Sequence, residues 1–151
     1  MPSLWYRLEL PHIFERMLAF SIPSQGRILV LSYEGLHTIS LFPNVTVATD
    51  EAYAEDYDIY DTEQNTLWYG GQLHRALGLY GGDPILEDGD GHYLNLEPEH
   101  ELLRIIDMTN HVIQEIKYFD LSGDWAFATF STDGKVLAIG VPSDLFIFYR
   151  D

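Results

Sequence analysis

The residue types best suited to recognition gather in one acidic, tyrosine-rich stretch, residues 50–63. Tyrosine offers rigid, amphipathic contact area, and carboxylates attract the arginine and lysine side chains of a partner. We therefore predict an exposed loop or edge strand that binds a basic protein surface. The alternative is a solvated loop whose tyrosine side chains pack inward. The candidate partner-binding residues are Tyr53, Glu55, Asp56, Tyr57, Asp58, Tyr60 and Asp61.

A second carboxylate cluster, Asp88-Gly89-Asp90-Gly91, resembles a calcium loop because hard cations prefer clustered carboxylate oxygens. It departs from the EF-hand pattern at the fifth and sixth places, where His92 and Tyr93 stand instead of Asp or Asn followed by Gly. Aspartate and glycine also favour tight turns. The sequence therefore favours a plain turn over a cation site.

The other residue types with catalytic potential show no spacing typical of a site. No Gly-x-Ser-x-Gly motif presents a nucleophile, and Gly70-Gly71 and Gly81-Gly82 lack the lysine of a phosphate-binding loop. The histidines lack the paired spacing of a zinc helix, so we expect each to be solvated or locally hydrogen-bonded. We predict no metal, no cofactor and no identifiable catalytic residue. The six histidines are His12, His37, His74, His92, His100 and His111.

The elements that must position these residues are predicted most clearly in the last third of the chain. Residues 128–140 hold two runs rich in β-branched and aromatic residues around Asp133-Gly134, and an Asp-Gly pair favours a tight hairpin turn. A third apolar run, Leu145 to Tyr149, follows the loop-forming residues 142–144. The segment is therefore predicted to be an antiparallel meander of at least three strands.

A similar pattern occurs near the N-terminus, in residues 17–41. Phe20-Ser21 matches Phe130-Ser131, and the run Gly26 to Leu29 matches Gly134 to Leu137. Repeated β-meanders imply units that bury their faces against one another. We expect Phe20 and Phe130 to occupy equivalent inward positions.

The run from Ala128 to Gly140 resembles the inner hairpin of a WD-repeat β-propeller blade, and residues 103–116 are similar to the strand and turn that close the preceding blade. The Trp-Asp pair that names the family is replaced by Tyr149-Arg150 and Ile106-Asp107. At ~40–45 residues per blade, the chain supplies about three and a half blades. The resemblance implies blade-like meanders and closure of the array by a strand from the opposite terminus.

Such a closing strand is expected at Leu4 to Leu10, which alternates partly, with Leu4, Tyr6 and Leu8 on one side and Trp5 and Arg7 on the other. We predict that it pairs with the apolar run at the C-terminus, because that run would invite aggregation as a bare edge. A homodimer that pairs edge strands between subunits is the alternative.

The central part of the chain is less clearly patterned. Thr66 to Tyr69 and His92 to Leu96 read as short strands, and Gln72 to Tyr80 as one or two helical turns. Residues 97–118 fit a helix by their apolar spacing and two strands by their β-branched content, and the resemblance favours strands slightly. Trp5 and Trp68 are expected in the core.

Composition bounds the protein class. At 151 residues and 46% apolar content, the chain fits a single β-repeat domain, residues 1–151, that needs no disulfide, and it contains no cysteine. The N-terminus lacks the apolar core of a signal peptide and no run reaches membrane-spanning length, so a cytoplasmic location is expected. Eight basic and 24 acidic residues give a net charge of -16, which repels nucleic acid and anionic membranes.

The sequence therefore predicts a mainly β fold of repeated antiparallel meanders, arranged as propeller-like blades or as a sandwich or barrel, with at most one or two short helices. The predicted function is a non-catalytic protein–protein interaction module that acts through the acidic, tyrosine-rich surface. An acidic inhibitor or immunity-type protein that neutralises a basic partner is one alternative. A carboxylate-dependent hydrolase is the other, and pocket shape would discriminate between binder and enzyme.

Overall fold

The computed structural model of the protein describes residues 4–54 and 57–150. It is mainly β, as predicted, with two short 3-10 helices, η1 and η2. The elements are β1 (Tyr6–Leu8), β2 (Met17–Ser21), β3 (Arg27–Ser32), β4 (Gly35–Ser40), β5 (Thr46–Asp50), η1 (Glu51–Tyr53), β6 (Tyr60–Asp61), β7 (Thr66–Tyr69), β8 (Gln72–Gly78), β9 (Tyr93–Glu97), η2 (Pro98–His100), β10 (Leu102–Ile106), β11 (Val112–Lys117), β12 (Phe127–Phe130), β13 (Val136–Val141) and β14 (Asp144–Tyr149).

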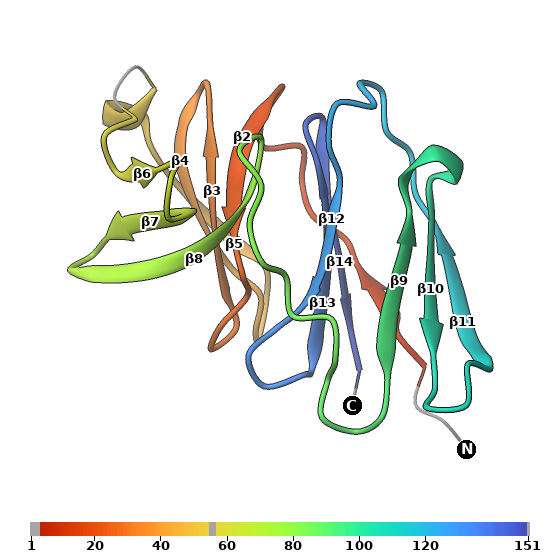
Figure 1. Ribbon diagram of the computed structural model, residues 1–151. Coiled ribbons are helices and arrows are strands. Elements are labelled where there is room, and N and C mark those ends of the chain that lie inside the picture. Colours follow the sequence, from red (N-terminus) through yellow and green to blue (C-terminus); the bar gives the residue numbers. More distant parts are fainter. Residues whose placement is uncertain (1–3, 55–56, 151) are drawn as a thin grey trace.

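The strands form antiparallel sheets that stand side by side (Figure 1). The strand orders are β1-β14-β13-β12, β11-β10-β9 and β5-β4-β3-β2-β8-β7-β6. In the seven-stranded sheet, the first part of β8, residues 72–75, pairs with β7, and its last part, residues 76–78, pairs with β2. The β6–β8 part then turns away from β2 to β5, at the opposite end of the molecule from β9 to β11 (Figure 1).

Three hydrophobic clusters fill the spaces between neighbouring sheets. One joins the β9–β11 sheet to the β12–β14 sheet and contains Trp5, Leu103 and Phe130. The second joins β12–β14 to the β2–β4 sheet and contains Phe20. The third lies between β2–β4 and β6–β8 and contains Leu67. Each sheet therefore depends on its neighbour to cover an apolar face, as repeated meanders should.

The internal repeat corresponds to two similar meanders, β2-β3-β4 and β12-β13-β14. Phe20 and Phe130 are both fully buried, each at the end of the first strand of its meander. The predicted Asp-Gly hairpin is confirmed, since β12 pairs with β13 around Asp133 and Gly134. Gly134 has a φ of 75°, and the Asp133 carboxylate accepts a hydrogen bond from Lys135 N at 3.0 Å.

The two ends of the chain are neighbours, as predicted. β1 pairs antiparallel with β14, and Tyr6 lies opposite Tyr149. The outer edge of β14 is therefore covered by the N-terminal strand. The facing predicted from alternation is wrong, because Tyr6 is half exposed. Trp5 is buried, which confirms the expectation that it lies in the core. Trp5 is drawn inward by Phe130, 5.5 Å away between ring centroids, and by Gln114, whose side-chain amide bonds both Trp5 N and Trp5 O.

Two expectations for the central region are corrected. Gln72 to Tyr80 is not helical, because β8 occupies Gln72–Gly78 and pairs with β7 across Gly70-Gly71. Both glycines have positive φ, 62° and 74°, which is the geometry of a two-residue hairpin turn. Trp68, expected in the core, is 55% exposed because it lies on the outer face of this hairpin opposite Leu73.

The ambiguous segment, residues 97–118, forms two strands after the short helix η2, so the helix alternative is wrong. β10 and β11 pair antiparallel around the turn at Asp107 to Asn110. The Asp107 carboxylate accepts hydrogen bonds from Thr109 N at 2.8 Å and His111 N at 2.9 Å, which stabilises that turn. Turn chemistry therefore outweighs the helical spacing of the apolar residues.

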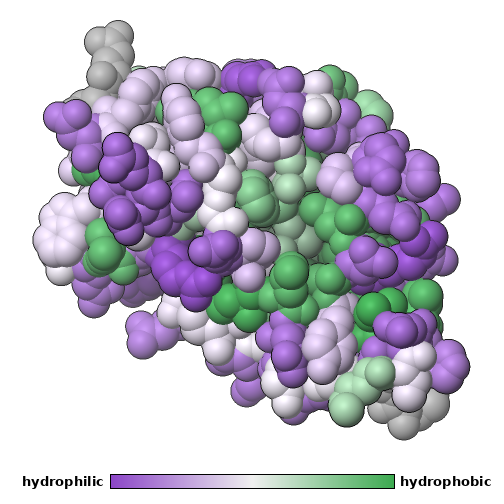
Figure 2. Space-filling model, viewed as in Figure 1, coloured by the Kyte–Doolittle hydropathy of each residue, from purple (hydrophilic) through white to green (hydrophobic). Residues whose placement is uncertain are grey.

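One face of the molecule is hydrophobic across its middle and hydrophilic on both flanks (Figure 2). The middle is crossed by the segment that joins β8 to β9 (Figure 1). Ile85 of this segment packs against two of the three clusters. The connection therefore closes the space between neighbouring sheets on this face. Within residues 4–54 and 57–150, no helix is long and apolar enough to cross a membrane.

Candidate functional site

The tyrosines of the acidic stretch anchor it to the body of the protein. Tyr60 is buried in the third cluster, and Tyr53 and Tyr57 are partly buried against it. Tyr57 Oη donates a hydrogen bond to Ala54 O at 2.8 Å. Burial raises the pKa of Tyr60, which keeps its hydroxyl protonated. The alternative interpretation, in which the tyrosines pack inward, is therefore correct for Tyr60.

The acidic residues of the same stretch lie outward from the tyrosines. Asp58 and Asp61 are exposed. The Asp61 carboxylate accepts hydrogen bonds from Glu63 N and Gln64 N, both at 3.0 Å, and so shapes the turn after β6. Glu55 and Asp56, two of the predicted partner-binding residues, lie outside the described residues. The segment thus combines a tyrosine-anchored backbone with carboxylates at the surface.

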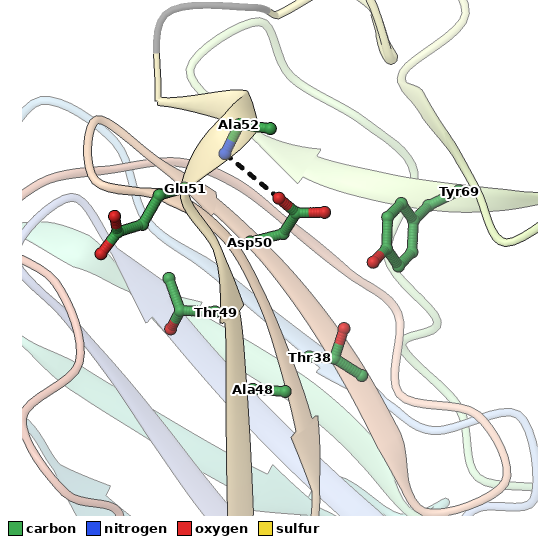
Figure 3. A pocket seen from close by; sticks show the side chains of 7 residues that line it. All are labelled: Thr38, Ala48, Thr49, Asp50, Glu51, Ala52 and Tyr69. Carbon is green, nitrogen blue, oxygen red and sulfur yellow. Dashed lines mark hydrogen bonds between the residues drawn. The ribbon is translucent and has the colours of Figure 1, made fainter.

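Beside this stretch lies an open depression with a volume of about 540 Å³, which we call the acidic depression. Asp50 and Glu51 line it at the junction of β5 and η1, and Tyr69 contributes a ring from β7. The Asp50 carboxylate lies on the side of Tyr69, whereas the Glu51 side chain points to the other side of this junction (Figure 3). Asp50 caps η1 by accepting a hydrogen bond from Ala52 N at 3.1 Å. The lining residues are Thr38, Ala48, Thr49, Asp50, Glu51, Ala52 and Tyr69.

The electrostatics of this depression suit a cation. Among the described residues, no lysine or arginine lies within ion-pair distance of Asp50 or Glu51. The ring of Tyr69 is held by a perpendicular contact with Tyr53, 5.8 Å between centroids. The Asp50 carboxylate, which has no lysine or arginine partner among the described residues, lies on the side of this ring (Figure 3). A carboxylate and an aromatic ring together offer ion pairing and cation–π contact to a guanidinium or ammonium group.

Sequence reasoning identified only part of this arrangement. Tyr53 of the predicted set touches Tyr69, whereas Tyr57 contacts Tyr33 and Tyr60 contacts Tyr80, with centroids 6.2 and 6.0 Å apart. Asp50 and Glu51 were within the acidic stretch but outside the predicted set. Tyr69 was missed because its neighbourhood depends on how β7 is placed, and local pattern carries no signal for that.

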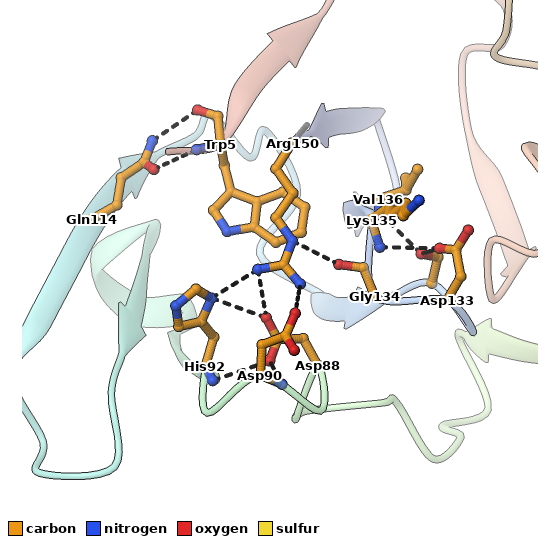
Figure 4. Close-up of polar contacts among 11 residues, drawn as sticks. Trp5, Asp88, Asp90, His92, Gln114, Asp133, Gly134, Lys135, Val136 and Arg150 are labelled. Carbon is orange, nitrogen blue, oxygen red and sulfur yellow. Dashed lines mark hydrogen bonds and ion pairs between the residues drawn. The ribbon is translucent and has the colours of Figure 1, made fainter. Parts of the chain in front are cut away.

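The Asp88–Asp90 loop is held by the guanidinium group of Arg150 (Figure 4). Asp88 Oδ2, in a side chain with no exposed surface, lies 3.0 Å from Arg150 Nη1 and 2.9 Å from His92 Nδ1. Arg150 Nη2 also pairs with the exposed Asp90 at 2.9 Å, and the guanidinium stacks over Trp5, 5.1 Å from the ring centroid. The plain-turn interpretation accounts for this loop.

The glycine of the repeat hairpin lets the loop approach. Arg150 Nε donates a hydrogen bond to Gly134 O at 3.1 Å. A Cβ atom on Gly134 would lie 2.8 Å from Asp88 O. The C-terminus, the loop and the hairpin therefore meet at one point. No group of three potential ligands that could hold a metal ion occurs in the described part of the chain.

One constellation resembles a catalytic dyad. Ser32 Oγ lies 2.7 Å from His37 Nε2, and His37 Nδ1 lies 2.8 Å from Thr49 Oγ1. Both Ser32 and His37 are buried, at 0% and 1% exposed, so no substrate reaches the hydroxyl. Burial lowers the pKa of His37, which keeps the ring neutral and satisfied by its hydroxyl partners. The dyad is therefore a buried polar bridge between β3, β4 and β5.

Comparison with protein-family models and with curated proteins gives no match for this sequence.

Proposed function

We propose that the protein is a non-catalytic interaction module that binds a basic protein, with the acidic depression receiving an arginine or lysine side chain of the partner. The observation that carries this proposal is the Asp50 carboxylate on the side of the fixed Tyr69 ring, with no lysine or arginine partner among the described residues. Glu51 adds a second carboxylate at the other side of the same junction. The net charge of -16 adds long-range attraction for a basic partner.

Exposed carboxylates further along the acidic stretch support the same function. Asp61 and Glu63 are exposed, and neither has a lysine or arginine partner among the described residues. Rim charges of this kind mainly increase the association rate and fix the partner's identity. An immunity-type protein that inhibits a basic enzyme or toxin would use the same binding chemistry. The difference is that its binding would block the activity of the partner.

The hydrolase alternative receives less support. A carboxylate pair in a hydrolase needs one acid whose pKa is raised. The His100 and Ser131 side chains lower the pKa of Glu97 and Asp133. For Glu34, hydrogen bonds outweigh the opposing effect of burial, and its pKa is also lowered. These carboxyl groups are therefore suited to staying ionised rather than to donating a proton.

The likeness to WD-repeat blades also stays a proposal. It is supported by the repeated three-stranded meanders and by β1, which adds to the last meander from the opposite terminus. The acidic depression is lined by β4, β5, η1 and β7, so it draws on two neighbouring meanders.

The test compares two variants with equal charge change. Asp50→Asn with Glu51→Gln removes the charges of the depression, and Asn keeps the helix cap. Glu99→Gln with Asp144→Asn is the control, because both residues are exposed and neither lines the depression. The probe is a hexa-arginine peptide, titrated against the full chain by NMR at low and physiological salt.

We expect the peptide to shift amide signals of residues 48–52 and 69, and binding to weaken with salt. Two exposed ion pairs contribute about 0.4–2 kcal/mol, so the depression variant should bind roughly two- to thirtyfold more weakly. The control should match the wild type apart from the change in net charge. Equal loss in both variants would show that the acidity acts only as a diffuse field and would refute the site.

A further inference from the structure

A second concavity lies next to the acidic depression and has the opposite character. It is a cleft of about 540 Å³ between the β7–β8 hairpin and strands β2 to β4, and we call it the basic cleft. Thr38 and Tyr69 line both concavities. The residues that line the cleft are Ser21, Ile22, Ser24, Gln25, Arg27, Leu29, Thr38, Tyr69, Gly70, Gln72, Leu73, His74, Arg75 and Thr132.

The charge of this lining departs from that of the chain as a whole. Acidic residues outnumber basic ones by 24 to 8 in the sequence. Yet the described residues that line the cleft include Arg27, Arg75 and His74 and no aspartate or glutamate. A carboxylate-free lining in so acidic a protein creates a local positive region, where an anion is attracted instead of repelled.

The two arginines are also available for a ligand. Within the described part of the chain, the arginines that pair with carboxylates are Arg7, Arg16, Arg104 and Arg150. Arg75 donates one hydrogen bond, from Nη2 to the backbone oxygen of Asp83 at 2.7 Å, and Arg27 makes no side-chain hydrogen bond to any described residue. Both side chains are exposed, so most of their guanidinium donors face solvent.

The sheet brings the arginines toward one place. Arg27 begins β3 and Arg75 lies on β8, and β2 runs between these strands. Ile22 N, at the end of β2, donates a hydrogen bond to Arg75 O at 2.9 Å. The two backbones are thus about two strand spacings apart, roughly 10 Å. By the strand register, Arg75 lies on the hairpin face of Leu73 and Arg27 on the sheet face of Leu29, so the two arginines reach the cleft from its two sides. Two long arginine side chains can span this distance around one oxyanion.

The rest of the lining suits the body of a small molecule. Ile22, Leu29 and Leu73 supply apolar surface, and Tyr69 supplies a ring. Thr132 Oγ1 donates to Ser24 Oγ at 3.2 Å, which places two hydroxyl groups at the mouth. The volume of the cleft falls within the range of small-molecule sites. The net charge of -16 opposes polyanions such as nucleic acid much more than a ligand with one or two charges.

We infer that the basic cleft is a binding site for a small organic anion, whose carboxylate or phosphate group is held by Arg27 and Arg75 and whose apolar or aromatic body lies against Tyr69 and Leu29. This site shares Thr38 and Tyr69 with the acidic depression, but its arginines are not part of that depression, so the inference stands whether or not the protein binds a basic partner.

The experiment uses the full chain and defined probes. Phenyl phosphate and benzoate are titrated while amide signals are followed by NMR, with benzyl alcohol as the neutral control and benzamidine as the cationic one. The two anions distinguish the phosphate from the carboxylate group. Arg27→Gln with Arg75→Gln removes the two cleft charges. The matched control is Lys117→Gln with Lys135→Gln, since both lysines are exposed and lie outside the cleft.

We expect at least one anion to shift, saturably, amides in residues 21–29 and 69–75. The arginine variant should bind it at least tenfold more weakly, and the lysine variant should bind it as the wild type does apart from the effect of net charge. Replacing both arginines by lysine should give intermediate affinity. Thermal denaturation of each variant checks that the fold is kept.

Four results would overturn the inference. Benzyl alcohol could bind as tightly as the anions, which would make the cleft merely apolar. The shifts could map elsewhere, or the lysine variant could lose as much affinity as the arginine variant. The absence of saturable binding by either anion would also refute it. None of these results bears on the hexa-arginine titration, so the failure of the two proposals can be told apart.

Discussion

The contact between Arg150 and Asp88 predicts a large and asymmetric loss of stability when it is broken. The side chain of Asp88 has no exposed surface and that of Arg150 is 8% exposed. Replacing Arg150 by Met keeps most of the side-chain volume but leaves the Asp88 carboxylate buried without its cation. Removing one partner of a buried ion pair costs about 3–5 kcal/mol, and we expect the free energy of unfolding to fall by that amount.

The same guanidinium provides an internal control. Asp90 pairs with Arg150 at 2.9 Å, close to the 3.0 Å of Asp88, but its side chain is 73% exposed. Solvent screens this second pair, so Asp90→Asn should cost less than about 1 kcal/mol. The two ion pairs therefore have nearly the same contact distance, and they differ in the burial of the aspartate side chain.

A double variant tests the cause. Arg150→Met combined with Asp88→Asn removes the buried charge together with its partner, and Asn keeps an oxygen that can accept from Asp90 N and His92 N. We expect the double variant to be more stable than Arg150→Met alone. The assay is urea denaturation at neutral pH, followed by circular dichroism. Equal losses for Arg150→Met and Asp90→Asn, or no recovery in the double variant, would refute the reasoning.

Three further predictions concern the core and its edges. Burial lowers the pKa of His37 below its ordinary 6.5, so the unfolded chain takes up this proton first as the pH falls. Stability should be full above that pH and decline as the pH drops toward the folded-state pKa, and a His37→Gln variant should lack this part of the pH dependence in urea titrations. Gly140→Ala would place a Cβ atom 2.2 Å from Phe20 Cε1, so a melting temperature equal to the wild type would contradict the packing described for this pair. Deleting residues 1–10 removes the buried Trp5 and exposes the edge of β14, so the truncated chain should aggregate or unfold in light scattering and thermal melts, and a soluble monomer of full stability would refute the pairing.

The sequence predicted those parts of the fold that depend on local chemistry. The Asp133-Gly134 turn is marked by residues that tolerate its backbone geometry, and the N-terminal strand was expected beside β14 because an apolar terminal run needs a cover. The error over β8 came from weighting the spacing of Leu73, Ala76 and Leu77 above the Gly70-Gly71 turn, although Gly-Gly is itself a hairpin signal. Short apolar runs fit both the helical and the strand spacing, so the turn residues decide which element forms.

The candidate sites could be predicted less well, because they combine residues from separate strands. The acidic stretch was visible as a run of like charges, but its neighbour Tyr69 is placed by the pairing of β7 with β8. Arg27 and Arg75 are isolated in the sequence and line one cleft because only β2 separates their strands. Tyr6 faces outward although alternation grouped it with the apolar side of its strand, because Trp5, expected in the core, takes the inward position against Phe130. The position of each of these side chains depends on which strands pair in the folded protein, and the local sequence pattern does not encode that pairing.

The two concavities share Thr38 and Tyr69, and this adjacency predicts an electrostatic coupling between their ligands. An anion beside Arg27 and Arg75 adds negative charge near the acidic depression, which should strengthen the binding of a cation there. For charges separated by roughly 10 Å, Coulomb's law gives ~0.4 kcal/mol at the dielectric constant of water and ~1.7 kcal/mol at the value typical of a protein surface. Linkage requires the effect to be reciprocal. The affinity for hexa-arginine should therefore rise about two- to twentyfold when the cleft is saturated with the anion that binds it, and less at high salt. The gain should vanish in the Arg27→Gln, Arg75→Gln variant, and a gain that persists there would mean that the anion acts at some other place.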